Sequence, residues 1–140
     1  NKQVFYFTNI APQYSGSFNT GGGAWNNLEG LVDGLVCSDT LYVVNNMCER
    51  KQQMKELADC FVCLPGSYGT LDEMMDVVAS GTVDEHRKPC FILNYQGFYE
   101  GLKLQVAHMR KLSFLPQEEQ YAPRFVDTMD ELLDALQRLV

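Results

Sequence analysis

Short apolar runs alternate along this chain with longer segments in which apolar residues recur every three or four positions. The run Cys60–Leu64 is apolar at every position, which predicts a strand buried on both faces, as in a parallel sheet. The other runs are rich in β-branched and aromatic residues, which favour strands. We therefore expect strands at Val4–Phe7, Thr40–Val44, Cys60–Leu64, Cys90–Leu93 and, as a last short one, Phe125–Val126.

The segments between these runs predict helices. Met47, Arg50, Met54 and Leu57 share one face of a helix by their spacing, and Asn45 or Asn46 can cap its start. We expect further helices at about Trp25–Val32, Leu71–Ser80 with Gly81 as its stop, Gly97–Lys111, and from a cap at Asp127 or Thr128 through Leu139. The alternation of strand and helix predicts an α/β fold with a parallel sheet, in which ligands bind beyond the carboxyl ends of the strands.

Length and charge narrow the class of protein. The chain has 140 residues, which suits a single domain, and a net charge of −7, which argues against a duplex nucleic-acid partner. No apolar run approaches the roughly 20 residues that span a bilayer. The first residues lack the layout of a signal peptide, so we expect a cytoplasmic protein.

The five cysteines predict free thiols, because their number is odd and no secretory signal is visible. Cys60 and Cys63 have the spacing of a redox motif, but they lie within a predicted strand and not at a helix start, where a thiolate would be stabilised. We interpret them as buried structural residues, and no second Cys or His pair completes a zinc site. His86 and His108 are expected at the surface.

The segment Cys63–Glu73, CLPGSYGTLDE, carries the candidate chemistry. Gly66 and Gly69 permit positive φ and close approach of another group to the backbone. A glycine-bearing turn before a helix N-terminus can bind an anion such as phosphate. Thr70 and Glu73 also fit a capping box, a purely structural role. The two interpretations are compatible, since a carboxylate in the first helical turn points back toward the loop.

Two motifs resemble those of the LOG family of cytokinin riboside 5′-monophosphate phosphoribohydrolases, long labelled lysine decarboxylases. Pro65–Glu73 resembles the motif PGGxGTxxE, and Met47–Met54 resembles M-x-x-R-K-x-x-M at a similar interval. Downstream, Lys88-Pro89, the next apolar run and Asn94–Tyr99 also resemble the family. The resemblance implies a Rossmann-like three-layer fold, a parallel sheet flanked by helices in a single domain over residues 1–140, usually as a homodimer and without metal or other cofactor.

The implied reaction is hydrolysis of the N-glycosidic bond of a nucleoside 5′-monophosphate, giving free base and ribose 5-phosphate. The family's catalytic arginine and glutamate fall on Arg50 and Glu73. The positions implied to bind substrate and phosphate are Met47, Lys51, Gly66, Ser67, Tyr68, Gly69 and Thr70. Cleavage builds positive charge on the ribose, which a carboxylate can stabilise.

The sequence also departs from the family's pattern. Ser67 replaces the second glycine of the motif, which would strain the backbone if this position requires positive φ. The N-terminal third carries Gly21-Gly22-Gly23 but continues atypically, and we expect that part to be incomplete. A non-catalytic carrier of nucleotide or molybdenum cofactor therefore stays open as an alternative. Lysine decarboxylation would need a pyridoxal phosphate lysine, and no lysine stands out for that role.

Overall fold

The computed structural model describes residues 4–7, 43–116 and 122–139. Its sheet has four strands in the order β1-β2-β3-β4, and every neighbouring pair is parallel. The strands are β1 (Val4–Phe7), β2 (Cys60–Cys63), β3 (Cys90–Leu93) and β4 (Arg124–Val126). The α/β fold with a parallel sheet is thus confirmed. The expected helix at 25–32, the Gly21–Gly23 turn and the start of the expected strand at 40–44 lie outside the described residues, and Val43 and Val44 are not in a strand.

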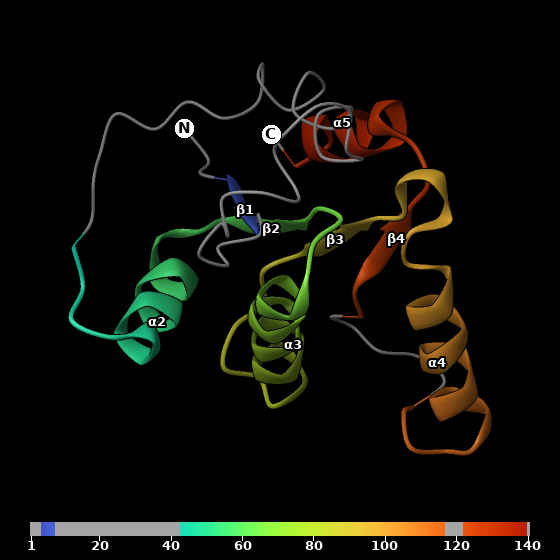
Figure 1. The fold of residues 1–140 in the computed structure, drawn as a ribbon, viewed down its shortest axis with the longest axis horizontal. Coiled ribbons are helices and arrows are strands. Elements are labelled where there is room, and N and C mark those ends of the chain that lie inside the picture. Colours follow the sequence, from blue (N-terminus) through green and yellow to red (C-terminus); the bar gives the residue numbers. More distant parts are fainter. Residues whose placement is uncertain (1–3, 8–42, 117–121, 140) are drawn as a thin grey trace, which may run out of the picture.

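Helices cover both faces of the sheet (Figure 1). On one face lie α2 (Met47–Leu57), α3 (Tyr68–Thr82) and α4 (Glu100–Lys111), and on the other lies α5 (Met129–Gln137). The alternation of strand side chains creates these layers. Phe61 packs with Met74 of α3, whereas its neighbour Val62 packs with Leu132 of α5. All four residues of β2 are buried, which confirms the prediction of a strand covered on both faces.

Two helix starts follow their predicted caps. Asn46 caps α2, because its Oδ1 accepts from the backbone N–H of Glu49 at 2.9 Å. The Glu49 carboxylate accepts in return from the backbone N–H of Asn45 at 2.9 Å, and this bond lowers the pKa of Glu49. Thr128 caps α5 in the same way, with its hydroxyl accepting from the N–H of Glu131 at 3.2 Å. Side-chain acceptors thus satisfy donors that a helix start leaves open.

The predicted start of α3 was wrong. The helix begins at Tyr68, with Ser67 as its N-cap residue, and it continues through Gly81 to Thr82. Thr70 is therefore a buried residue of the first turn, and its hydroxyl has no partner among the described residues. The Thr70–Glu73 capping box does not form, because Thr70 lies inside the first turn and is not the N-cap residue. Oε1 of Glu73 bonds to Arg50 of α2.

The helix expected from Gly97 is also divided. A 3₁₀ turn at Tyr95–Gly97 precedes α4, which begins at Glu100. Gln96 and Gly97 have φ of 51° and 74°, a left-handed conformation that interrupts an α-helix. This turn places Tyr99 in the core against the end of β2, as described below.

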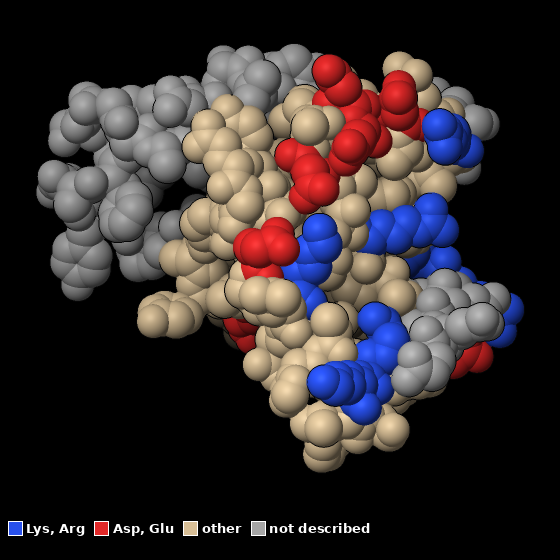
Figure 2. Space-filling view, turned by 90° about the vertical axis from the view of Figure 1, so that its right-hand side faces the viewer, with Lys and Arg blue, Asp and Glu red and all other residues tan. Residues whose placement is uncertain are grey.

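Charges are separated on the side formed by α4, β4 and α5 (Figure 2). Acidic side chains gather in the upper part of this view and basic side chains lower. The first turn of α5 carries Asp130 and Glu131, and the last turn of α4 carries Arg110 and Lys111. Both arrangements complement the helix dipole, which favours anions at the N-terminus and cations at the C-terminus.

Candidate functional site

The candidate site lies where β2 ends and α3 begins, at the carboxyl edge of the sheet. The chain leaves Cys63, passes through Leu64, Pro65 and Gly66, and enters α3 at Tyr68. Because α2 leads into β2 from the opposite direction, its N-terminal half lies at this same edge. The tertiary structure thus brings the two sequence motifs to one place.

Arg50 and Glu73 form an ion pair between these helices. Nη1 of Arg50 donates to Oε1 of Glu73. The Glu73 side chain is only 4% exposed, whereas that of Arg50 is 24% exposed. The second carboxylate oxygen, Oε2 of Glu73, is buried without a hydrogen-bond partner among the described residues. A buried polar atom without a partner is costly, so this oxygen is suited to receive one from a ligand or water.

Further ion pairs hold the two helices in register. Nζ of Lys51 lies 2.6 Å from Oδ2 of Asp72, and Nζ of Lys55 lies 3.2 Å from Oδ2 of Asp76. The hydrogen bond to Asp72 raises the pKa of Lys51, so this lysine is charged at neutral pH. Lys55 also donates to Oγ of Ser80 at 3.1 Å. Arg50 is therefore carried by a helix whose position relative to Glu73 is fixed at several points.

The turn before α3 supplies backbone donors. The first described bond of the helix runs from the N–H of Leu71 to the carbonyl of Ser67, so the N–H groups of residues 68–70 have no helical acceptor. Ser67 has φ of −94° and adopts an extended conformation without left-handed strain. Position 67 therefore does not require positive φ, and Gly97 is the glycine with positive φ among the described residues.

Residue 66 has to be glycine because of packing, and not because of its φ angle. A Cβ at this position would lie 2.2 Å from Oγ1 of Thr70. Gly69 has open space: apart from its chain neighbours and the backbone of its own helix, no atom of the described residues lies within 4 Å of a Cβ at that position. The Gly66 backbone thus packs directly against the first turn of α3, and Gly69 leaves room in front of it. Together with the buried Thr70 hydroxyl, these groups form a turn that can accommodate an anion.

Met47 and Tyr68 border this edge as the first residues of α2 and α3. Met47 is 56% exposed and Tyr68 is 89% exposed. Apolar and aromatic side chains at the rim of an anion-binding turn are suited to contact the non-polar part of a ligand.

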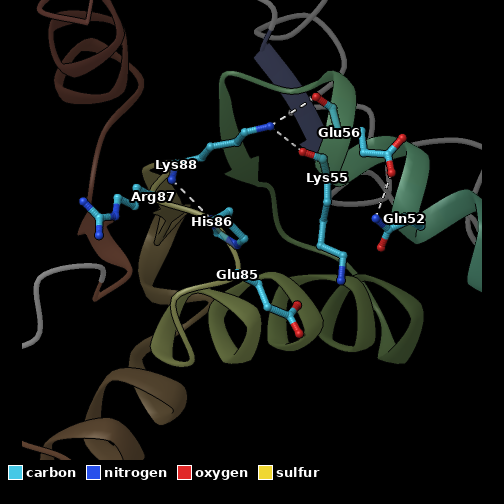
Figure 3. A pocket seen from close by; sticks show the side chains of 7 residues that line it. All are labelled: Gln52, Lys55, Glu56, Glu85, His86, Arg87 and Lys88. Carbon is cyan, nitrogen blue, oxygen red and sulfur yellow. Dashed lines mark hydrogen bonds between the residues drawn. The ribbon is translucent and has the colours of Figure 1, made fainter.

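A separate pocket of about 540 Å³ lies near the end of α2 and the segment before β3 (Figure 3). Several of its charged and polar groups join elements of the fold. Nζ of Lys88 donates to the backbone carbonyls of Lys55 and Glu56 in the last turns of α2. His86 is half-buried, contrary to expectation, with Nε2 donating to the carbonyl of Val77 at 2.8 Å and Nδ1 accepting from the N–H of Lys88 at 3.2 Å. We therefore do not assign a ligand to this pocket.

The described cysteines agree with the structural interpretation. Cys60, Cys63 and Cys90 are buried, and Cys48 is exposed. Burial raises the pKa of Cys63 to about 12 and also raises the pKa of Cys90, so both thiols are protonated at neutral pH. Across residues 4–7, 43–116 and 122–139, no group of three or more His, Cys, Asp or Glu side chains is placed to bind a metal ion.

Sequence reasoning missed two residues that contact the end of β2 and its neighbours. The buried hydroxyl of Tyr99 donates to the carbonyl of Leu64 at 2.7 Å, and the buried Asn94 side chain accepts from the Tyr99 N–H at 2.7 Å. The segment Asn94–Tyr99 resembles the family, but its local pattern predicts no role for either side chain. A contact between residues 35 positions apart leaves no signal in that pattern.

Comparison with known proteins places these motifs in context. Residues 35–136 match the profile of a family described as "Possible lysine decarboxylase". A cytokinin riboside 5′-monophosphate phosphoribohydrolase of Mycobacterium marinum is 34% identical over 98 residues, covering 70% of this chain and 52% of the relative. Its counterpart LOG5 of Arabidopsis thaliana is 40% identical over 75 residues, covering 51% of this chain and 33% of the relative. The rice protein LOG4, named as probable, is 43% identical over 60 residues, covering 43% and 26%.

The chain thus spans about half or less of the length of these curated relatives. The matched part contains the two helices and the turn that form the candidate site. Among the described residues, no helix has both the length and the apolar character needed to cross a membrane.

Proposed function

The chain belongs to the LOG family, whose profile is described as "Possible lysine decarboxylase", and we propose that it hydrolyses the N-glycosidic bond of a nucleoside 5′-monophosphate. The substrate class is a cytokinin riboside 5′-monophosphate or a similar adenine nucleotide, and the products are the free base and ribose 5-phosphate. The names of the relatives support this reaction over a non-catalytic carrier.

The observation that carries the proposal is the Arg50–Glu73 pair beside the start of α3. Glu73 is buried, one of its oxygens is held by Arg50, and the other has no described partner. A carboxylate oriented in this way is suited to face a centre on which positive charge develops. Arg50 is always cationic and holds the Glu73 carboxylate in its orientation, which is a positioning role.

In the proposed reaction, the bond between C1′ of the ribose and the base nitrogen breaks, and its electron pair leaves with the base. The Oε2 atom of Glu73 stabilises the positive charge on the ribose ring and accepts a proton from the attacking water. The water oxygen forms the new bond to C1′, and the departing base takes a proton from solvent.

The remaining predicted residues are proposed to bind the substrate. The 5′-phosphate contacts the N–H groups at the start of α3, with Gly66, Ser67, Gly69 and Thr70 forming the turn around it. The Thr70 hydroxyl, buried without a described partner, supplies a further donor. Met47 and Tyr68 contact the base, and Lys51 adds positive charge.

We also propose that the protein forms a homodimer and acts in the cytoplasm. Size-exclusion chromatography with light scattering would test the homodimer.

Turnover against a panel of nucleoside 5′-monophosphates tests the reaction. Chromatography should detect free base and ribose 5-phosphate in equal amounts, and the matching nucleosides without phosphate should react far more slowly. Tight binding of nucleotide without either product would instead identify a carrier and overturn the proposal.

Glu73→Gln tests the assignment of the carboxylate. This substitution keeps the shape of the side chain but removes its charge, so kcat should fall by roughly 100-fold or more. Asp72→Asn is the matched control, because Asp72 is the adjacent residue and its side chain is 62% exposed. The control should retain kcat within about 3-fold, as expected for an exposed ion pair. Equal kcat in both variants would remove Glu73 from the mechanism.

A further inference from the structure

Tyr99 touches the polypeptide at three points around the end of β2. Its hydroxyl donates to the carbonyl of Leu64 at 2.7 Å and lies 3.3 Å from Sγ of Cys63. Burial raises the pKa of Tyr99, and the Gly66 backbone beside the phenol acts in the opposite direction. The hydroxyl thus holds the chain directly before Pro65, where the strand ends and the turn begins.

This arrangement compensates for the proline. Pro65 has no N–H, so the strand cannot continue its ladder through this residue. Both Leu64 and Pro65 are buried, away from water that could satisfy the neighbouring peptide groups. The buried Tyr99 hydroxyl donates to the Leu64 carbonyl and so satisfies this acceptor without moving the turn.

Tyr99 is itself rigidly held. Its backbone N–H donates to Oδ1 of Asn94, whose side-chain N–H₂ group donates to Oε2 of Glu100 at 3.0 Å and Oδ1 of Asp127 at 2.9 Å. The backbone N–H of Asn94 donates to the carbonyl of Val126 at 2.8 Å. Tyr99 is only 3% exposed, and its ring packs edge-on against Phe98. Residues at the carboxyl ends of β3 and β4 therefore hold the Tyr99 hydroxyl in place.

The position of Gly66 is in turn transmitted to the anion-binding turn. Gly66 lies so close to Thr70 that no side chain fits between them. A displacement of Gly66 must therefore move Thr70 and the N–H groups at the start of α3. Backbone donors bind an anion well only when their positions are fixed before the ligand arrives.

We propose that Tyr99 is a positioning residue that presets the turn Pro65–Thr70 for the phosphate group of the substrate. The proposal rests on the function proposed above. Tyr99 does not touch the substrate; it acts through Leu64 and Gly66.

Tyr99→Phe removes the hydroxyl and keeps the ring. Isothermal titration calorimetry with ribose 5-phosphate should show roughly 10-fold weaker binding, the loss expected for about 1.4 kcal/mol of misplaced donors. In the turnover assay KM for the nucleotide should rise by a similar factor, with a smaller change in kcat. Tyr95→Phe is the matched control, since Tyr95 is half-buried against the α5 side of the sheet. It should leave both values within about 2-fold, as expected for loss of a hydroxyl outside the turn Pro65–Thr70.

Equal affinity of the Tyr99→Phe and Tyr95→Phe variants for ribose 5-phosphate would overturn the proposal. The binding measurement does not depend on catalysis. If the wild-type protein binds ribose 5-phosphate but releases no base from a nucleotide, the proposed reaction fails. The affinities of Tyr99→Phe and Tyr95→Phe for ribose 5-phosphate then still decide the role of Tyr99. If the wild-type protein does not bind ribose 5-phosphate at all, both proposals fail.

Amide hydrogen exchange of the wild-type protein provides a test that requires no variant. In the ligand-free protein the Gly66 N–H should be protected, because the proposal places it against the buried Tyr99 hydroxyl, whereas the Gly69 N–H should exchange quickly. Ribose 5-phosphate should then slow exchange at Gly69. Equally fast exchange at Gly66 and Gly69 in the ligand-free protein would contradict the preset turn. This test remains valid if the Tyr99→Phe variant fails to fold.

Discussion

The Cα of Gly66 faces the side chain of Thr70 so closely that a Cβ would lie 2.2 Å from the Thr70 hydroxyl and 2.8 Å from its Cβ. Real Cβ atoms do not approach other atoms at such distances, so residue 66 has to be glycine unless the turn moves. The contact joins the end of β2 to the first turn of α3. It therefore connects a packing requirement to the candidate anion site.

Gly66→Ala should destabilise the protein by about 1–3 kcal/mol, the usual cost of adding a methyl group to a filled site. Gly69→Ala is the matched control, because in the described part of the chain its added methyl meets no atom within 4 Å beyond its chain neighbours and its own helix backbone. Alanine in a helix is favoured over glycine by roughly 0.5–1 kcal/mol, so this variant should be as stable as the wild type or more so. Urea denaturation measures both values. Equal stability of the two variants would show that the turn relaxes around Gly66.

The N-cap of α2 provides a second test. Asn46→Ala removes the acceptor for the Glu49 N–H and should lower the free energy of unfolding by about 1 kcal/mol. Asn46→Ser retains a capping oxygen and should stay within a few tenths of a kcal/mol of the wild type. Thermal or urea denaturation distinguishes them. A cost for the serine variant equal to that for alanine would mean that the Asn46 side chain acts in another way.

Two of the three ion pairs described between α2 and α3 should differ in strength. Arg50→Met leaves the buried Glu73 charge without its partner and should cost roughly 2–4 kcal/mol, somewhat below a fully buried pair because Arg50 is 24% exposed. Lys51→Met breaks a pair whose Asp72 side chain is 62% exposed and should cost about 1 kcal/mol or less.

The double variant Arg50→Met/Glu73→Leu completes that test. Removing both charges should recover much of the stability lost in Arg50→Met, because no buried charge then lacks a partner. Urea denaturation measures the free energy of unfolding of the wild type, Arg50→Met, Lys51→Met and the double variant. A double variant that is no more stable than Arg50→Met would show that the cost comes from packing rather than from the uncompensated charge.

Thiol reactivity should separate the described cysteines. Iodoacetamide at pH 8 should modify Cys48, which is exposed, and spare Cys63 and Cys90. The pKa of Cys63 is raised to about 12 by burial, so its thiolate is scarce at this pH and the sulfur is also inaccessible. Peptide mass spectrometry before and after addition of urea measures the labelling. Rapid labelling of Cys63 in the folded protein would contradict the structural role of these residues.

The sequence correctly predicted much of the fold because its signals are local. The apolar run at Cys60–Leu64 and the caps at Asn46 and Thr128 depend on residues within a few positions of one another. The start of α3 was misplaced for the opposite reason. Thr70 and Glu73 have the spacing of a capping box, but α2 brings Arg50 to Glu73 and the packing of Gly66 buries Thr70. Tertiary contacts thus changed the roles of two residues whose spacing alone favoured a cap.

By itself, the sequence determined the alternation of strands and helices and the two motifs that carry the candidate chemistry, since periodicity, turn residues and motif spacing are properties of neighbouring positions. Only the tertiary structure decided that Arg50 meets Glu73 across 23 residues and that Tyr99 reaches Leu64 across 35. Such pairs form because the parallel sheet gathers the ends of separate strands and helices at one edge. Their geometry depends on how those elements pack, which no local pattern encodes.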